Sequence, residues 1–415
     1  MDVSKKAMVV FQLLEQKGFE AYLVGGCVRD SLVGRTPKDW DFTTNATPEE
    51  ITDVFETAEY KVVPTGIKHG TVSVVIDSEV FEITTFRTDG EYNDGRHPET
   101  VEFASSIEED LKRRDFTMNS IAYNPKKGFV DPFGGKEDIK NKVVRANGLA
   151  TERFEEDALR MMRAIRFSSQ LSFEIEKSTF EAIKTCSDLI DKISKERIVE
   201  ELKKTLESNA HLGIKFLIET ELLDKIMLNV DMEKVKKFSN FFKLSPADQN
   251  IRLAGIFFSM LETESDRNIV LDIASKTMKS LKYDNETKEN VIALLTYGDI
   301  NFKSIREFKE MLATIGESKT TMLLDFDKAI ANFRGVELED INRKKELAKK
   351  IFENNIPIKM SQLAINGKDL INLLGIKEGK VVGRVLNKLL DIVLENHLLN
   401  KKNILIDFAK KEIEC

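Results

Sequence analysis

The sequence has little cysteine, histidine or tryptophan, with three, four and one of these residues among 415. Cys27, Cys186 and Cys415 are too scattered for a disulfide framework or for zinc-ligand spacing, and this usage fits the reducing cytoplasm. No apolar run reaches the roughly 18 residues that a membrane span needs, so we expect no membrane partner. Basic residues are not in excess either. The formal net charge of -7 excludes a wholly basic surface, so any nucleic-acid partner must be bound by local patches.

The residues that are present change in character along the chain. Up to about residue 150, the β-rich runs "AYLVGG", "DWDFTT", "GTVSVVI", "VFEITTF" and "VEFA" alternate with turn residues, which predicts a small mixed or antiparallel sheet with inserted helices. After Thr151, apolar residues recur every three or four positions, which predicts packed helices with breaks at "KLSPADQ" (243–249) and "NNIPIKMSQ" (354–362). The first 16 residues are expected to form an amphipathic helix, not a cleaved leader. A chain of this length is expected to fold as two to four domains. We therefore predict an α+β head followed by helical domains.

Two aspartates, Asp39 and Asp41, flank the single tryptophan in the run "DWDFTT". In a strand, positions i and i+2 share a face, so the two carboxylates would project together while Trp40 and Phe42 face the core. Neighbouring carboxylates repel and raise each other's pKa unless a cation lies between them. Magnesium, which prefers oxygen ligands and takes one or two carboxylates beside substrate phosphates, would resolve this repulsion. The alternative is a pair of ordinary polar-face aspartates near a strand end.

Upstream of the aspartates, the apolar run in "AYLVGGCVRDSLVG" leads into Gly25 and Gly26 and then into a helix that carries Arg29. Paired glycines allow the backbone to approach a ligand closely, and the start of a helix offers free amides to a phosphate. A simple tight turn is the alternative reading. Followed after twelve residues by the D-x-D strand, this pattern resembles the DNA polymerase β-like nucleotidyltransferases.

The resemblance extends to one branch of that superfamily, the bacterial (class II) tRNA CCA-adding enzymes and their poly(A) polymerase relatives. The segment "LVGGCVRDSLVGRTPKDWDFTTNATPEE" is similar to their first motif. Further similar blocks follow in order: "TGIKHGTVSVV" (65–75), "FEITTFRTDGEYNDGRHPETVEF" (81–103), "EEDLKRRDFTMNSIAYN" (108–124), "RFEEDALRMMRAIRF" (153–167) and "SKERIVEELKKTL" (194–206). The helical half is covered mainly by "INGKDLINLLGIKEGKVVGRVLNKLL" (365–390), which is similar to the tail of the Gram-positive-type enzymes.

The resemblance implies a reaction in which an RNA 3′-hydroxyl attacks the α-phosphate of a nucleoside triphosphate and pyrophosphate leaves. It implies that Asp39 and Asp41 hold two Mg2+ ions. Glu82 is our candidate for a third acidic group because it alternates onto the polar side of a neighbouring strand, although a solvated strand carboxylate would look the same. The residues expected to bind the nucleotide are Gly25, Gly26, Arg29, Arg114, Asp115, Asn119, Asp157, Arg160 and Arg163.

Asp115 is expected to contact the ribose and Arg114 the triphosphate, with Asn119 in support; a capped helix start is the alternative for this stretch. Asp157 and Arg160, three apart and expected on one helix face, are the pair that the resemblance assigns to reading the base, supported by Arg163. Cytosine and adenine both offer an amino donor beside a ring-nitrogen acceptor, which an Asp and an Arg match, while uracil and guanine do not. The alternative is an ordinary intrahelical ion pair.

These observations lead to a prediction for the whole chain. The domains are expected to be a catalytic head (1–150), a neck that reads the base (151–205), a helical body (206–330) and a tail that binds the tRNA acceptor arm (331–415). The tail would use Lys368, Lys377 and Lys380. The reaction is template-independent addition of CMP, CMP and AMP from CTP and ATP, in the cytoplasm and with no protein partner inferred. The loop at 87–98 favours full CCA addition, since enzymes restricted to CC tend to lack it. An A-adding or poly(A)-type transferase and a non-catalytic tRNA-binding protein are the alternatives.

Overall fold

The computed structural model describes residues 1–89, 101–263, 266–375 and 379–414, and it divides into two compact units. Unit 1 comprises Met1–Met232 with Ser280–Lys282, and unit 2 comprises Glu233–Lys279 with Tyr283–Cys415. Within the described ranges, none of the helices has the length and apolarity needed to cross a membrane. The finer division into head, neck, body and tail stays a prediction.

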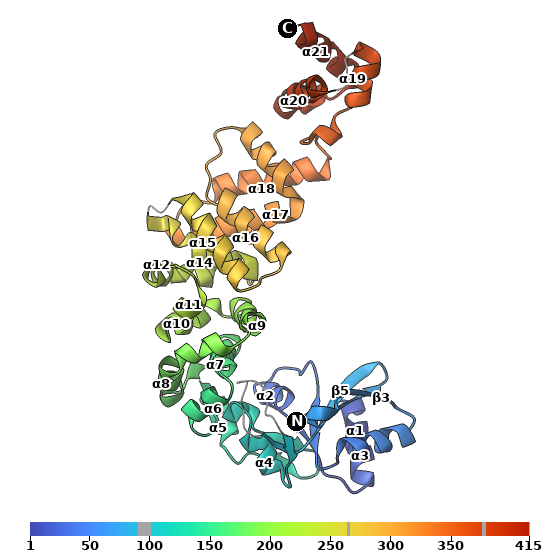
Figure 1. Cartoon of the computed structure of the whole chain (residues 1–415), viewed down its shortest axis with the longest axis vertical. Coiled ribbons are helices and arrows are strands. Elements are labelled where there is room, and N and C mark those ends of the chain that lie inside the picture. Colours follow the sequence, from blue (N-terminus) through green and yellow to red (C-terminus); the bar gives the residue numbers. More distant parts are fainter. Residues whose placement is uncertain (90–100, 264–265, 376–378, 415) are drawn as a thin grey trace. The chain divides into compact units, whose positions relative to one another are not determined.

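Unit 1 begins with a seven-stranded mixed sheet in the order β3-β4-β5-β2-β1-β8-β9. Figure 1 labels β3 and β5 of this sheet. The pairing of β2 with β5 is parallel, and the other neighbours are antiparallel. The strands are β1 (Ala21–Val24), β2 (Asp41–Thr44), β3 (Lys61–Gly66), β4 (Thr71–Ile76), β5 (Glu79–Thr85), β8 (Ala122–Asn124) and β9 (Gly128–Val130). A separate hairpin joins β6 (Arg87–Asp89) to β7 (Val101–Phe103). All five runs predicted as strands are confirmed, whereas β3, β6, β8 and β9 were not predicted.

Two helices, α1 (Lys5–Gln16) and α3 (Pro48–Thr57), pack against the sheet. The expected amphipathic helix at the start is confirmed as α1, and its Phe11 packs edge-on against Phe42 of β2, which in turn packs edge-on against Phe81 of β5. This aromatic contact fixes β2 and β5 from the core side, so the residues that alternate with Phe42 face outward. The shorter helices of the head are α2 (Gly26–Leu32), α4 (Ile107–Lys112) and α5 (Gly135–Lys140).

The rest of unit 1 is helical, as predicted, apart from a two-residue parallel pairing of β10 (Val143–Val144) with β11 (Glu174–Ile175). Helix α7 packs against α9 and α10, and its side chains are buried along most of its length. The helices are α6 (Ala150–Glu156), α7 (Leu159–Leu171), α8 (Lys177–Thr185), α9 (Lys195–Leu206), α10 (Ala210–Glu219) and α11 (Leu222–Ile226).

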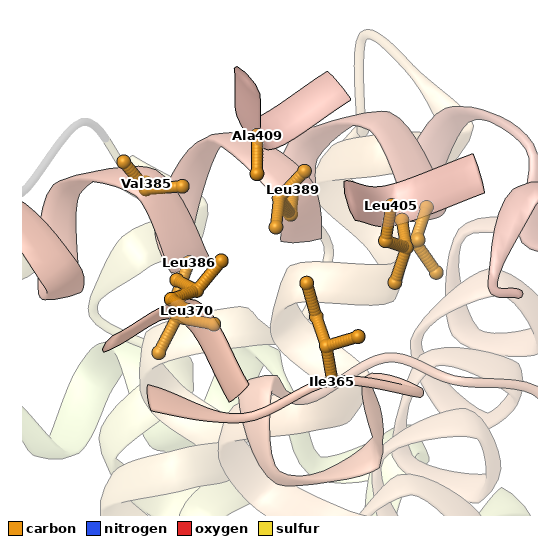
Figure 2. Packing of buried hydrophobic residues seen from close by; sticks show 8 residues of the cluster. Ile365, Leu370, Val385, Leu386, Leu389, Leu405 and Ala409 are labelled. Atoms are coloured by element: carbon orange, nitrogen blue, oxygen red, sulfur yellow. The ribbon is translucent and has the colours of Figure 1, made fainter. Parts of the chain in front are cut away.

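Helices make up unit 2, and both predicted breaks are confirmed between helices. They are α12 (Met232–Lys237), α13 (Ser239–Leu244), α14 (Gln249–Phe258), α15 (Arg267–Ser280), α16 (Asn285–Tyr297), α17 (Ile305–Arg334), α18 (Glu339–Glu353), α19 (Gly367–Leu374), α20 (Lys380–Glu395) and α21 (Lys402–Glu414). Gly316, with φ 78° and ψ 179°, interrupts α17. A phenylalanine cluster fills the centre, with the Phe241 and Phe326 ring centroids 5.7 Å apart. Figure 2 shows a second cluster, where Leu370 of α19, Leu389 of α20 and Leu405 of α21 are buried together.

Candidate active site

The two aspartates of "DWDFTT" lie where β2 begins. The strand starts at Asp41, and Asp39 lies in the bend that precedes it, so the strand-face argument applies to only one of the two. Trp40 and Phe42 are buried, as predicted, with 8% and 1% of their surface exposed. In the parallel pairing of β2 with β5, Asp41 lies directly opposite Glu82. The sheet thus brings together carboxylates that are about 40 residues apart in the chain.

Burial and the neighbouring carboxylates both disfavour the charged form of Asp41. Burial, together with the nearby charges of Asp39 and Glu82, raises the pKa of its carboxyl to about 6, and the charge of Arg114 opposes this rise. A divalent cation would relieve that repulsion, and oxygen ligands suit such a cation. Over the ranges that the structure describes, no three His, Cys, Asp or Glu side chains are gathered closely enough to hold a metal. The carboxylates of Asp39 and Asp41 are the type of ligand that such a cation takes beside substrate phosphates, and Glu82 lies opposite Asp41 on the neighbouring strand.

Gly25 and Gly26 connect β1 to α2. Gly25 has φ 72° and ψ -128°, a conformation open to glycine but strained for residues with a Cβ. A Cβ at Gly25 would lie 3.3 Å from Nη1 of Arg114, so the guanidinium packs against the bare backbone. The other end of that guanidinium is held by Asp110, whose Oδ2 accepts from Arg114 Nη2 at 2.9 Å. The Nε atom of Arg114 is buried and has no hydrogen-bond partner in the part of the chain that the structure describes.

Asp115 is the centre of a saturated network. Its Oδ2 accepts from Arg163 Nε and Nη2 at 2.9 and 2.6 Å, and its Oδ1 accepts from Asn119 Nδ2 at 3.0 Å and the Phe116 amide at 2.9 Å. Asn119 in turn accepts at Oδ1 from Arg29 Nη1 at 2.8 Å. Burial alone would raise the pKa of Asp115, but the Arg163 charge and the hydrogen bonds lower it to about 2. The carboxylate is therefore ionised, and a ribose hydroxyl could reach it only by sharing an oxygen with these donors.

The expected helical placement of Asp157 is wrong. Helix α6 ends at Glu156 and α7 begins at Leu159, and Asp157 between them is extended, with φ -143° and ψ 101°. Its Oδ1 accepts from the Leu159 amide at 3.0 Å, so the side chain bonds the first residue of α7 from just before the N-cap Ala158. Its Oδ2 forms an ion pair with Arg197 of α9 at 2.8 Å, while Arg160 pairs with Glu156. The ion pair of Arg160 thus crosses the break to the last residue of α6, so the alternative of an intrahelical pair between Asp157 and Arg160 is wrong as well.

One cavity of about 600 Å³ in unit 1 collects the predicted residues. Eleven of the twelve catalytic and nucleotide-binding candidates line it, and Glu82 does not. Its charged lining consists of seven arginines and five aspartates, an excess of positive charge that suits a triphosphate. The full lining is Gly25, Gly26, Arg29, Asp30, Asp39, Asp41, Arg113, Arg114, Asp115, Asn119, Asp157, Leu159, Arg160, Arg163, Arg166, Phe167 and Arg197.

Some lining residues were not singled out from the sequence. Arg113, Arg166, Phe167 and Arg197 all belong to the blocks that resemble the family motifs, "KRRD", "RMMRAIRF" and "SKERIVEE", so block membership was the available signal. Leu159 and Asp30 are the other additions, and Asp30 Oδ1 accepts from Arg29 Nε at 2.9 Å. Sequence spacing could not show that these side chains converge, because they come from four separate segments.

The remaining predicted residues lie elsewhere. Most of the loop at 87–98, from residue 90 onward, lies outside the described residues; Arg87 at its start donates from Nη1 to the His69 carbonyl. Lys368 in the first turn of α19 and Lys380 at the start of α20 are exposed residues of unit 2. Lys377 lies outside the described residues.

Three family models match successive parts of the chain. They are described as the poly A polymerase head domain (residues 21–145), the probable RNA and SrmB-binding site of polymerase A (172–233) and a putative tRNA nucleotidyltransferase domain 2 (267–409). The "CCA-adding enzyme" of Ligilactobacillus salivarius is 39% identical over 419 residues, covering 100% of this chain and 98% of its own length. The enzyme of the same name from Enterococcus faecalis is 36% identical, with 98% and 96% covered.

Solved structures agree over nearly the full length. The Bacillus stearothermophilus CCA-adding enzyme in complex with CTP superposes with a TM-score of 0.80 at 31% identity, covering 99% of each chain. The Thermotoga maritima CCA-adding enzyme complexed with tRNA has a TM-score of 0.65 at 23% identity, covering 99% of this chain and 96% of its own, which shows the shared fold. The chain therefore belongs to the family of CCA-adding enzymes, among the tRNA nucleotidyltransferases.

Proposed function

We propose that this chain adds CMP, CMP and AMP in turn to the 3′ end of tRNA, using CTP and ATP and releasing pyrophosphate. The observation that carries the proposal is the cavity lined together by the carboxylates, the glycine turn and the arginines that this chemistry requires. Relatives that carry the name CCA-adding enzyme over the full length support it. The buried, free thiols of Cys27 and Cys186 support a cytoplasmic location.

In this proposal, Asp39 and Asp41 hold two Mg2+ ions, which bind together with the triphosphate. When bound, the metal lowers the pKa of the attacking hydroxyl and neutralises charge on the leaving pyrophosphate. Asp41 supplies a carboxylate whose repulsion from Asp39 and Glu82 favours cation binding over the metal-free state. The exposed Asp39, in its bend before β2, faces the same cavity.

The triphosphate binds where Gly25 leaves room and where Arg114 and Arg29 supply charge. The buried Nε atom of Arg114, which has no partner among the described residues, is the donor that an incoming phosphate oxygen would satisfy. Phosphoryl transfer is catalysed mainly by positioning and by charge stabilisation, and a pinned guanidinium provides both. Asp115 has its oxygens occupied, so its first task is to hold Arg163 and Asn119 in place.

Asp157 and Arg160 read the base. The Asp157 carboxylate accepts from the exocyclic amine shared by cytosine and adenine, and Arg160 donates to the adjacent ring nitrogen. Because Arg160 is only 8% exposed, a uracil or guanine edge would leave a buried polar group unpaired in this cavity. The placement of Asp157 in a fixed break, held by Arg197 and by the Leu159 amide, supports a reading role because it gives the carboxylate one orientation.

The helical units provide the remaining functions of the proposal. The neck reads the base, and the body and tail bind the tRNA acceptor arm through backbone contacts, with Lys368, Lys377 and Lys380 as candidate phosphate ligands.

A nucleotide-by-nucleotide assay tests the function. The protein is incubated with tRNA that lacks its terminus and with tRNA that ends in CC, and CTP, ATP, UTP and GTP are supplied one at a time. We expect CMP on the first tRNA and AMP on the second. Incorporation of AMP on the second tRNA alone would instead establish an A-adding enzyme. If no nucleotide is incorporated into either tRNA, the result would favour a non-catalytic tRNA-binding protein.

Two sets of variants test the residues. The double variant Asp39→Asn with Asp41→Asn should lose incorporation at least a thousandfold, whereas the exposed Asp53→Asn should retain it. Asp157→Ala should increase misincorporation of UMP and GMP about tenfold more than it slows CMP addition, since it removes a reader and not a metal ligand. If D157A loses activity while its selectivity among the four nucleotides is unchanged, the assignment of Asp157 to base reading is wrong.

A further inference from the structure

The Phe167 ring lies at the centre of the arginines of the cavity. Phe167 is on α7, lines the cavity and is only 4% exposed. Three guanidinium carbons lie close to its ring centroid, those of Arg166 at 3.9 Å, Arg29 at 4.9 Å and Arg163 at 5.3 Å. All three distances are within the about 6 Å over which a cation is attracted to the face of an aromatic ring.

The ring completes a closed circuit of side chains. Arg29 donates to Asn119, Asn119 donates to Asp115, and Asp115 accepts from Arg163. Phe167 then contacts both Arg163 and Arg29, which closes the circuit. The members come from α2, from the segment that follows α4, and from α7, so the circuit fixes three parts of the chain against one another.

Electrostatics give the ring a task that an aliphatic side chain could not perform. Arg29 and Arg163 are like charges that converge on one cavity, and their hydrogen bonds link them only indirectly, through Asn119 and Asp115. The negative face of an aromatic ring attracts both cations without neutralising either, so the charge stays available to a ligand. Phe116, edge-on at 5.7 Å and 82°, restrains the ring from the side of the Asp115 segment.

We infer that Phe167 is a positioning residue for nucleotide binding, and that it acts through the π-face that holds Arg29 and Arg163. The inference rests on the proposed function, because it assigns the arginines to the nucleotide. Phe167 does not touch the carboxylates at the start of β2 in any contact described above. Loss of the π-face should therefore raise KM for CTP and ATP while kcat changes little.

Graded fluorination of the ring separates this role from simple packing. Phe167 is replaced by mono-, di- and trifluorophenylalanine, which weaken the negative face stepwise while the ring keeps nearly the same size. We expect the dissociation constant for CTP, measured without tRNA, and the KM for CTP to rise stepwise to about tenfold, which corresponds to about 1.4 kcal/mol. The same series at Phe55, a fully buried ring of α3 outside the cavity, is the matched control and should leave both constants within twofold.

Conventional substitutions provide a second measurement. Phe167→Leu should raise KM about tenfold, and Phe167→Tyr, which keeps a π-face, should restore it to within threefold. An affinity that does not change with fluorination, or a Phe167→Tyr variant as impaired as Phe167→Leu, would overturn the inference. If the wild-type protein fails to incorporate CMP or AMP, the proposed function is wrong. If the wild-type protein is active and fluorination of Phe167 does not change its affinity for CTP, only the role of Phe167 is wrong.

Discussion

Replacing Gly25 by alanine should damage nucleotide binding more than it damages the fold. The position has φ 72° and ψ -128°, where an L-residue is strained by about 1–3 kcal/mol. In a unit of this size, 1 kcal/mol lowers the melting temperature by about 2–4 °C, so a loss of about 2–12 °C is expected. The new Cβ would also lie 3.3 Å from Nη1 of Arg114, which is tighter than ordinary contact.

The functional effect follows from this close contact. Arg114 is held between Gly25 and Asp110, so it must shift by a few tenths of an ångström or tilt away from the cavity. If this weakens one charge-assisted hydrogen bond to the triphosphate, KM for CTP should rise by roughly tenfold or more. The assay combines a thermal melt with steady-state CMP incorporation at varied CTP concentration.

The matched control is Gly18→Ala. Gly18 has φ 86°, and a Cβ at this position would have no atom within 4 Å, so alanine there brings backbone strain without a contact on any site residue. It should lower the melting temperature and leave KM unchanged. If Gly25→Ala raises KM by less than twofold, or if Gly18→Ala raises it as much, Gly25 serves only as a turn residue and the phosphate-binding argument for it fails.

Three further predictions concern other parts of the chain. Burial raises the pKa of Asp327 to about 7 from an ordinary value of 3.8, so between these values the folded state binds a proton that the unfolded state releases. The free energy of unfolding should therefore fall as pH rises from about 4 to 7. Asp327→Asn should remove most of this fall in a pH series of thermal melts. Gly255→Ala would place a Cβ 2.3 Å from Cε1 of Phe241 and should destabilise unit 2 by about 1–3 kcal/mol in denaturant unfolding, with KM for CTP unchanged. Arg197→Gln would leave the Asp157 carboxylate without its ion pair and should increase UMP misincorporation about tenfold in the single-nucleotide assay.

Two of these predictions have a control variant in the chain. Asp325→Asn, two residues from Asp327 in the same helix, should keep the wild-type pH dependence; a parallel loss there would contradict the assignment to Asp327. For Gly255, a variant as stable as the wild type would mean that the Phe241 ring can move aside. For Arg197, the control is substitution of the exposed Arg343 by glutamine, which should leave nucleotide selectivity unchanged. If Arg197→Gln also leaves nucleotide selectivity unchanged, Arg197 does not support base reading.

The membership of the cavity could be predicted from the sequence because its residues lie in short blocks with fixed spacing. Gly25, Asp41 and Asp115 each carry a local signal: a glycine that a turn requires, a carboxylate beside a buried strand residue, and an acid next to paired arginines. Such signals can be recognised in the sequence without knowledge of the fold. The same is true of the long helical half, where the periodicity of apolar residues is sustained over many turns.

The geometry within the cavity could not be predicted in the same way. "EEDALRMMR" is a good helix throughout by propensity, and only the capping preference of Asp157 hinted at the break before α7. The convergence of three guanidiniums on Phe167 depends on how α2 and α7 pack, which no spacing encodes. The missed strands β3 and β9 lie at the edges of the sheet, where a proline such as Pro64 is tolerated and where the strand pattern is weak.

The parallel pairing of β2 with β5 has a consequence for the order in which the head folds. Parallel neighbours need a long crossover, and here α3, β3 and β4 must be in place before Asp41 meets Glu82. Contacts of such long range form late, because chain entropy must be lost before they can contribute. The repulsion that Glu82 adds at Asp41 thus arises only once β2 and β5 have paired. A nascent or partly folded chain does not carry this concentration of negative charge, and cations bind preferentially to the finished head, which they stabilise by mass action.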